Sequence, residues 1–242
     1  MNVLSESAAP PRPAGAAGRR VSLIPVLAGI GFTVSWLAGL VLPVPNLAVT
    51  APASEVIGRY GPHLGMVQAQ FVLTEGLPAI GLAVIAAVLA RVARAAGRGR
   101  AGVILVSGLL AAVISVAQYA LGVMLAGWAL PERASGRTAL LFQALNRLDG
   151  VKMLALAVLA TAALALTAGP AAPLPRWLRY ASLALAVSIT VSGVGYLFLI
   201  EGLAPVAYVS GVALLVWVTG TGVALGWRGR AAGRQAPCPA QG

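Results

Sequence analysis

Charged side chains are scarce in this 242-residue chain. They make up 10% of the sequence, whereas 59% of the residues are hydrophobic, and the mean hydropathy is +0.90. An average soluble domain carries roughly a quarter charged residues. A water-soluble fold is therefore excluded, and the composition indicates an integral membrane protein.

Metal-binding and redox side chains are almost absent as well. The chain has one Cys, one His and six acidic residues, too few ligands for a Cys or His zinc site, an iron–sulfur cluster or a bis-His haem. The lone Cys238 excludes an internal disulfide and a dithiol redox pair. The sequence also has no Gly-rich phosphate loop, no HExxH motif, no GxSxG elbow and no CxxC pair. We therefore expect no metal and no cofactor.

Basic residues, in contrast, are in excess and give a formal net charge of +11. In a soluble protein this charge would suggest a nucleic-acid partner. Here the arginines stand between apolar runs, where they orient helices and meet anionic headgroups. The expected partners are therefore membrane lipids, and no nucleic acid is expected.

Six apolar segments follow one another along the chain. They cover residues 21–42, 68–90, 102–128, 150–168, 179–200 and 204–226. The first is uncharged and has 22 residues, enough for a helix to cross the bilayer core. The sequence predicts an all-α integral membrane protein, a bundle of six transmembrane helices over residues 21–227, with disordered tails at 1–20 and 228–242.

Charge asymmetry predicts the orientation of this bundle. With a cytoplasmic N-terminus, twelve basic residues fall on the inner side and five on the outer side, which favours a multi-pass protein of the cell membrane with both termini cytoplasmic. The acids fall the other way, because the outer side holds all of them except Glu6: Glu55, Glu75, Glu132, Asp149 and Glu201. Polar chemistry is therefore expected on the outer side.

Glu75 is placed inside a predicted helix. Only 15 residues separate it from Arg91, so a spanning helix of about 20 residues includes it. Two interpretations stay open: an acid near a helix N-terminus that is held by the helix dipole, or a functional acid, base or counter-ion. Gln68 and Phe71 lie seven and four residues earlier on the same helical face. Pro78 removes a backbone donor and predicts a kink.

Two further acids extend the candidate site. Glu201 stands before the last apolar segment, either as the acid of a helix start or as a second carboxylate. Gln143, Asn146, Asp149 and Lys152 follow at i+3 spacing and form one polar stripe if the segment is helical. That stripe is either an interfacial helix from which Lys152 snorkels to water or a cover that closes a pocket, and Asp149 is within reach of Lys152.

Aromatic and amide side chains complete the candidate site. Several aromatic residues lie deeper than an aromatic belt requires, so we expect them to line a cavity around Glu75. Gln118 needs a partner, because an unpaired amide is costly in hydrocarbon. The predicted substrate-binding residues are Trp36, Gln68, Phe71, Gln118, Tyr119 and Tyr196.

These groups suit proton transfer to or from a lipophilic molecule, since a partly buried carboxyl is a general acid or base and aromatic faces stabilise cations. In its small size, helical membrane architecture and intramembrane acid, the chain resembles the small integral-membrane terpene cyclases of meroterpenoid and drimane-type pathways. The resemblance is one of architecture over roughly the six-helix core. It implies metal-free, acid-initiated cyclisation of a prenylated, isoprenoid-type substrate, with Glu75 as the leading catalytic acid and Asp149 or Glu201 as a second carboxylate.

Two other classes of function remain open from the sequence. In a proton- or cation-coupled transporter, or a membrane subunit of a transport complex, Glu75 would be the coupling site. A carrier is expected to show pseudo-repeated halves and polar residues near the midplane, whereas the polarity here is one-sided. A scaffold without chemistry would leave Glu75 paired with an arginine and without a cavity beside it.

Overall fold

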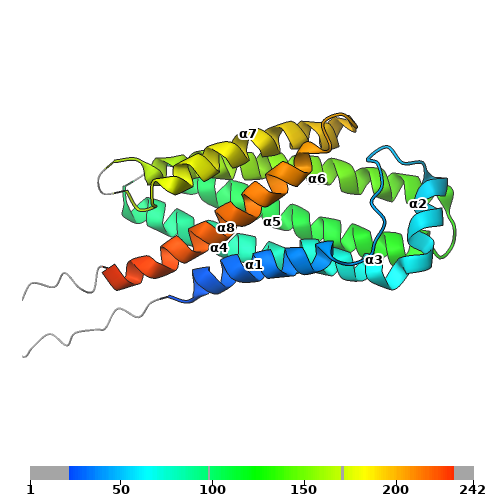
Figure 1. Ribbon diagram of the computed structural model, residues 1–242, viewed down its shortest axis with the longest axis horizontal. Helices are drawn as coiled ribbons and strands as arrows, with labels where there is room; N and C mark the ends of the chain where they lie inside the picture. Colours follow the sequence, from blue (N-terminus) through cyan, green and yellow to red (C-terminus); the bar gives the residue numbers. More distant parts are fainter. Residues whose placement is uncertain (1–21, 98, 170–171, 232–242) are drawn as a thin grey trace, which may run out of the picture.

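The computed structural model describes residues 22–97, 99–169 and 172–231, and every regular element in them is helical (Figure 1). The long helices are α1 (Ile24–Leu40), α4 (Leu77–Ala95), α5 (Ala101–Met124), α6 (Ser135–Ala163), α7 (Trp177–Phe198) and α8 (Val206–Ala231). The short helices are α2 (Ala53–Tyr60) and α3 (Leu64–Phe71), joined by a 3₁₀ turn at Gly61–His63. Two π-helical turns lie at Val72–Gly76 and Leu125–Ala129, and a second 3₁₀ turn at Leu164–Thr167.

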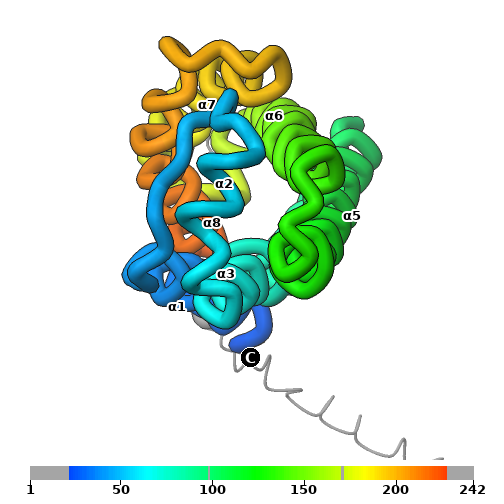
Figure 2. Tube along the Cα trace, turned by 90° about the vertical axis from the view of Figure 1, so that its right-hand side faces the viewer, coloured from blue at the N-terminus to red at the C-terminus, as the bar shows by residue number. Residues whose placement is uncertain are grey.

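The long helices form a closed ring. Each contacts its neighbours in chain order, α1 with α4, then α5, α6, α7 and α8, and α8 contacts α1 again. Seen end-on in Figure 2, the helices surround the axis of the bundle, and α2 lies across part of one end. We call this the α2 end. The first turn of α1 and the last turn of α8 lie together at the opposite end (Figure 1).

Five helical stretches are long and apolar enough to cross a membrane, namely Ala53–Ala95, Ala101–Ala129, Ser135–Thr167, Trp177–Phe198 and Val206–Trp227. In contrast, α1 is apolar but has 17 residues, about 26 Å of helix against a hydrocarbon core of about 30 Å. Large apolar side chains face outward, such as Val106, Val113 and Val187, each about two-thirds exposed. This surface indicates a membrane protein. The structure thus shows an all-helical fold with five helices of spanning length, where the sequence predicted six.

Two of the predicted segments are longer in the structure. The stretch predicted at 68–90 begins at Ala53, and the stretch predicted at 150–168 begins at Ser135. Hydropathy identifies only the apolar part of a helix. The added part of the first stretch carries charged side chains, and that of the second carries charged and amide side chains. Both parts are helical without being apolar, and they bring polar groups to the α2 end.

The chain ends are described only in part. Helix α8 continues to Ala231, four residues into the tail predicted at 228–242. The rest of that tail and the one predicted at 1–20 lie outside the described residues.

Close packing around Trp217 fills the ring toward the end opposite α2. Trp217 is 1% exposed, and its indole Nε1 donates to the hydroxyl of Ser182 at 2.7 Å, which joins α8 to α7. Helices α1 and α8 approach closely at Gly222, where a Cβ would stand 2.4 Å from the carbonyl oxygen of Pro25, an approach typical of small-residue helix contacts. This packed region fixes the helix positions from which the α2 end is built.

Candidate functional site

Glu75 stands in a widened turn of the helix that leads into α4. Residues Val72–Gly76 form a π-helical turn, in which the N–H of Leu77 donates to the carbonyl of Val72, five residues back. Pro78 follows directly; it has no N–H to donate, and its ring crowds the carbonyl four residues earlier. A π turn accommodates both effects, and such turns are frequent at functional sites. The kink that Pro78 predicts therefore takes the form of a π turn at Glu75.

The π turn leaves one backbone carbonyl without a helical donor, and α1 supplies one. The carbonyl of Leu73 has no helical donor, because Leu77 bonds to Val72 and the next residue, Pro78, has no N–H. The hydroxyl of Ser35, on α1, donates to this carbonyl at 2.6 Å. A buried carbonyl without a partner is costly. The bond from Ser35 therefore fixes the π turn, with its carboxylate, against α1.

Glu75, Lys152 and Asp149 form a buried ion network between the π turn and α6. The ammonium of Lys152 donates to both carboxylate oxygens of Glu75, at 2.8 and 2.7 Å, and lies 2.7 Å from Oδ1 of Asp149. The side chains of Glu75 and Lys152 are each 12% exposed, and that of Asp149 is 20% exposed. Two carboxylates share one ammonium, so the network has one formal negative charge in excess.

Gln118 of α5 completes the ion network. Gln118 donates from Nε2 to Oδ1 of Asp149 at 3.3 Å and to the carbonyl of Leu145 at 3.2 Å. The Nε2 of this intramembrane amide thus has the partners that it requires, whereas its Oε1 is buried without a hydrogen-bonding partner among the described residues. The network is thus held by side chains from three separate parts of the chain.

The predicted polar stripe lies within α6 itself. Gln143, Asn146, Asp149 and Lys152 all belong to this one helix. Gln143 is exposed at the α2 end, whereas the ammonium of Lys152 lies between two carboxylates. The pairing of Asp149 with Lys152 is confirmed, and an interfacial helix with a snorkelling Lys152 is wrong. Two anionic partners at hydrogen-bonding distance replace the water that a snorkelling ammonium would reach.

A cavity of about 820 Å³ opens beside the ion network at the α2 end. We call it the α2-end pocket. Its apolar wall includes Leu37 of α1, Met153 and Leu156 of α6 and Leu215 of α8. Its polar and aromatic lining residues are Glu75, Asp149, Lys152, Glu201, Asn46, Gln70, Trp36, Tyr60, Tyr196 and Tyr208. An apolar cavity with a few convergent polar groups is the usual form of a small-molecule site.

The connection between α1 and α2, residues 41–52, lies along the mouth of the α2-end pocket and supplies much of its wall. Asn46 donates from Nδ2 to the hydroxyl of Tyr208 at 2.5 Å, and the hydroxyl of Thr50 donates to Glu201. Both bonds tie the connection to the start of α8 and the turn before it. Glu201 therefore lies in that turn at the pocket mouth, and not in the first turn of a helix.

The α2-end pocket brings together five of the nine predicted site residues. These are the three acids Glu75, Asp149 and Glu201, together with Trp36 and Tyr196. They come from α1, the π turn, α6, α7 and the turn before α8, so residues far apart in the sequence share one cavity. Their chemical roles remain predictions.

The other four predicted residues do not line the α2-end pocket. Phe71 packs against α5 at Gly122, where a Cβ would stand 2.2 Å from its ring. The ring of Tyr119 packs against the π turn at Val72–Gly76, and Gln68 lies close to Gly127 in the π turn that follows α5. Gln118 reaches the ion network from behind, through its bond to Asp149.

The π turn also explains why Gln70, which the sequence analysis did not predict, lines the pocket. In a regular α-helix, the residues four and seven positions before Glu75 share its face, and these are Phe71 and Gln68. A π turn pairs residues five apart, and Gln70, five positions before Glu75, lines the pocket with it. Pro78 was the signal that could have indicated the change of register.

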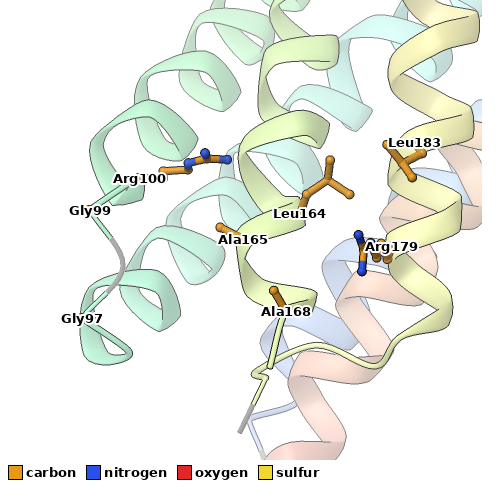
Figure 3. A pocket seen from close by; sticks show the side chains of 8 residues that line it. All are labelled: Gly97, Gly99, Arg100, Leu164, Ala165, Ala168, Arg179 and Leu183. Carbon is orange, nitrogen blue, oxygen red and sulfur yellow. The ribbon is translucent and has the colours of Figure 1, made fainter. Parts of the chain in front are cut away.

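A second cavity, of about 470 Å³, lies at the opposite end of the bundle, between the start of α5, the end of α6 and the start of α7 (Figure 3). Arg100 and Arg179 approach it from α5 and α7. Its described lining residues include no acidic side chain. Carboxylates therefore line the α2-end pocket, and none is found among the described lining residues of this one.

The fold and the α2-end pocket define an all-helical membrane protein with a buried ion network beside a ligand-sized cavity. The chain matches no protein-family model, no curated protein and no solved structure with which it was compared. Its function is therefore inferred from the fold and the site alone.

Proposed function

We propose that this protein crosses the membrane six times, with α1 as the first crossing and both termini in the cytoplasm, and that it is an enzyme. It binds a lipophilic, isoprenoid-type molecule in the α2-end pocket and carries out metal-free acid–base chemistry on it, an isomerisation or cyclisation that starts by proton transfer. The observation that supports this proposal is the contact between the ion network and the pocket. The carboxyl group of Asp149 lies 2.7 Å from the ammonium of Lys152 at the wall of a largely apolar cavity.

The geometry distributes roles among the three charged residues. Both carboxylate oxygens of Glu75 accept hydrogen bonds from Lys152, so Glu75 acts as the counter-ion that positions the ammonium. Asp149 is the more exposed carboxylate, and its Oδ1 alone has hydrogen-bonding partners within the described part of the chain. Oδ2 of Asp149 is therefore the oxygen that exchanges a proton with the ligand.

A complete reaction leaves the ion network unchanged. One substrate carbon receives a proton from the carboxyl group of Asp149, and the resulting carboxylate removes a proton from another carbon. Lys152 keeps its protons, because its ammonium donates to Glu75 and Asp149. The substrate is rearranged with no net gain or loss of protons, which is the balance of an isomerisation or a cyclisation.

A transporter is the second candidate, and one observation favours it. The two cavities lie at opposite ends of the bundle, and the buried side chains of Leu159, Leu185 and Trp217 belong to the core between them. In this reading the ion network is a coupling site for a proton or cation, and the ligand passes through unchanged.

A deuterium-incorporation experiment tests the enzyme proposal. The purified protein in nanodiscs is incubated in D₂O with a lipid extract of its producing cells, and the lipids are examined by mass spectrometry. Wild-type protein is expected to place deuterium on carbon in at least one lipid, because the exchangeable proton of Asp149 becomes a deuteron. Asp149→Asn and Glu75→Gln should lose this activity.

The matched control is Glu132→Gln. Glu132 pairs with Arg137 on the surface, where its side chain is 49% exposed, so the variant also removes one carboxylate from an ion pair but leaves the pocket intact. It should retain full incorporation. Absence of deuterium in every lipid, or equal incorporation by wild type and Asp149→Asn, would overturn the enzyme proposal and leave the transporter.

A further inference from the structure

The lining of the α2-end pocket is unbalanced in charge. Three acids and one base line it, Glu75, Asp149 and Glu201 against Lys152, which gives a formal charge of −2. The ammonium of Lys152 is already shared between Glu75 and Asp149. Glu201 accepts a hydrogen bond from Thr50, a neutral group. The excess charge of Glu75 and Asp149 is partly buried, which is unfavourable, and a bound positive charge would reduce this cost; Glu201 is exposed at the pocket and adds to the attraction.

Aromatic rings surround the same space. Trp36, Tyr60, Tyr196 and Tyr208 line the pocket from four different elements. Trp36 is fixed by close packing against α8, since a Cβ on Gly211 would stand 2.9 Å from its ring. Aromatic faces attract cations, and the attraction is larger in a desolvated site.

The shape and chemistry of the pocket favour an organic cation over a metal ion. Among the described residues, no group of three or more His, Cys, Asp or Glu side chains is placed to hold a metal. The cavity of about 820 Å³ is the size of a small-molecule site. Its apolar wall, with Leu156 and Leu215, suits a hydrocarbon body.

We propose that the α2-end pocket recognises a positive charge carried on a lipophilic body, with the charge near Asp149 and the aromatic rings and the body along the apolar wall. The charge is either an ammonium group of the ligand or a cation formed on carbon during proton transfer. This inference rests on the proposed function for the location of the ligand, and it names the class of ligand that the pocket takes.

Two probes of equal shape test the inference. Dodecyltrimethylammonium carries a permanent charge, and 2,2-dimethyltetradecane is its neutral counterpart. Binding is measured by equilibrium dialysis with the full chain in nanodiscs of phosphatidylcholine, whose headgroups have no net charge. The ammonium probe should bind roughly tenfold more tightly, the ratio that corresponds to about 1.4 kcal/mol for one desolvated cation site. Equal affinities for the two probes would overturn the inference.

Variants show whether the preference arises in the pocket. Asp149→Asn and Glu201→Gln should each reduce the ratio of the two affinities by several-fold, whereas the surface variant Glu132→Gln should leave it unchanged. Glu201 lies in an exposed turn, so its variant tests the inference even where Asp149→Asn fails to fold. If the ammonium probe keeps its full advantage over the neutral probe in Glu201→Gln and in every Asp149 variant that folds, the inference is wrong.

The D₂O experiment separates this inference from the proposed function. If the ammonium probe blocks deuterium incorporation into a neutral lipid, the recognised charge is one formed on carbon. If the deuterated lipid is itself an amine, the charge belongs to the ligand. If no lipid is deuterated but the cation preference is present and sensitive to Glu201→Gln, the enzyme proposal fails and the inference about the ligand stands.

Discussion

Removing the charge of Lys152 should destabilise the protein strongly even when the size of the side chain is kept. Lys152→Met keeps the length and apolar stem of the side chain but removes the ammonium. Glu75 and Asp149, 12% and 20% exposed, then face each other without a cation, and the formal charge of the ion network changes from −1 to −2. Glu75→Gln removes the other partner of this ion pair. It leaves Lys152 paired with Asp149, and these two charges cancel.

The two variants should therefore differ strongly in stability. Removing one partner of a buried ion pair costs about 3–5 kcal/mol, which for a chain of this size is a fall in Tm of about 6–20 °C. Glu75→Gln loses hydrogen bonds but strands no buried charge, and its expected cost is about 1–2 kcal/mol. Adding Glu75→Gln to Lys152→Met returns the network to a charge of −1 and should recover part of the loss.

Thermal unfolding in nanodiscs, followed by near-UV circular dichroism, measures all three variants under one condition. A Tm for Lys152→Met within about 2 °C of wild type would refute the reasoning, because a shift that small corresponds to less than about 1 kcal/mol. Equal losses for Lys152→Met and Glu75→Gln would refute it as well. They would show that the pair contributes through its hydrogen bonds and not through the balance of buried charge.

Three other predictions follow from the fold. Gly150→Ala should destabilise the protein by about 1–3 kcal/mol in the same unfolding assay, because its Cβ would stand 2.5 and 2.7 Å from backbone atoms of α7. Gly136→Ala on the same helix meets no atom within 4 Å and should be neutral or stabilising. Equal effects of the two substitutions would contradict the close approach of α6 and α7. Ser35→Ala should cost about 1–3 kcal/mol by leaving the carbonyl of the π turn without a donor, and an unchanged Tm would show that this carbonyl has another partner. The orientation is tested in a chain with its native cysteine replaced. Ser54→Cys should react with an impermeant maleimide added to intact cells, and Arg100→Cys should not. The reverse pattern would show that the topology is the opposite of the one proposed.

Much of the fold was predictable because hydropathy is a strong local signal. Long apolar runs without charge have no soluble alternative, so the all-helical membrane class follows from composition and segment length. The grouping of acids at one end of the bundle was also visible, since Asp149 and Glu201 precede their apolar segments and Glu75 lies in the outer half of its own, all on the same side. The structure places all three in one pocket.

The partners of these acids were not predictable in the same way. The i+3 spacing of Asp149 and Lys152 indicates a possible pair, but the contact of Lys152 with Glu75 spans 77 residues, and no local pattern determines which helices lie side by side. Asn46 belongs to a connection with no periodicity, so its role at the pocket mouth depends on the bond to Tyr208. Such long-range pairings are determined by how the ring closes.

The closure of the ring has a consequence for stoichiometry. Because α8 returns to contact α1, the helices of one copy of the chain surround the α2-end pocket. Each chain is then expected to hold one complete site. Ligand saturation should follow a simple hyperbola with a Hill coefficient of about 1, and one ligand should be bound per chain.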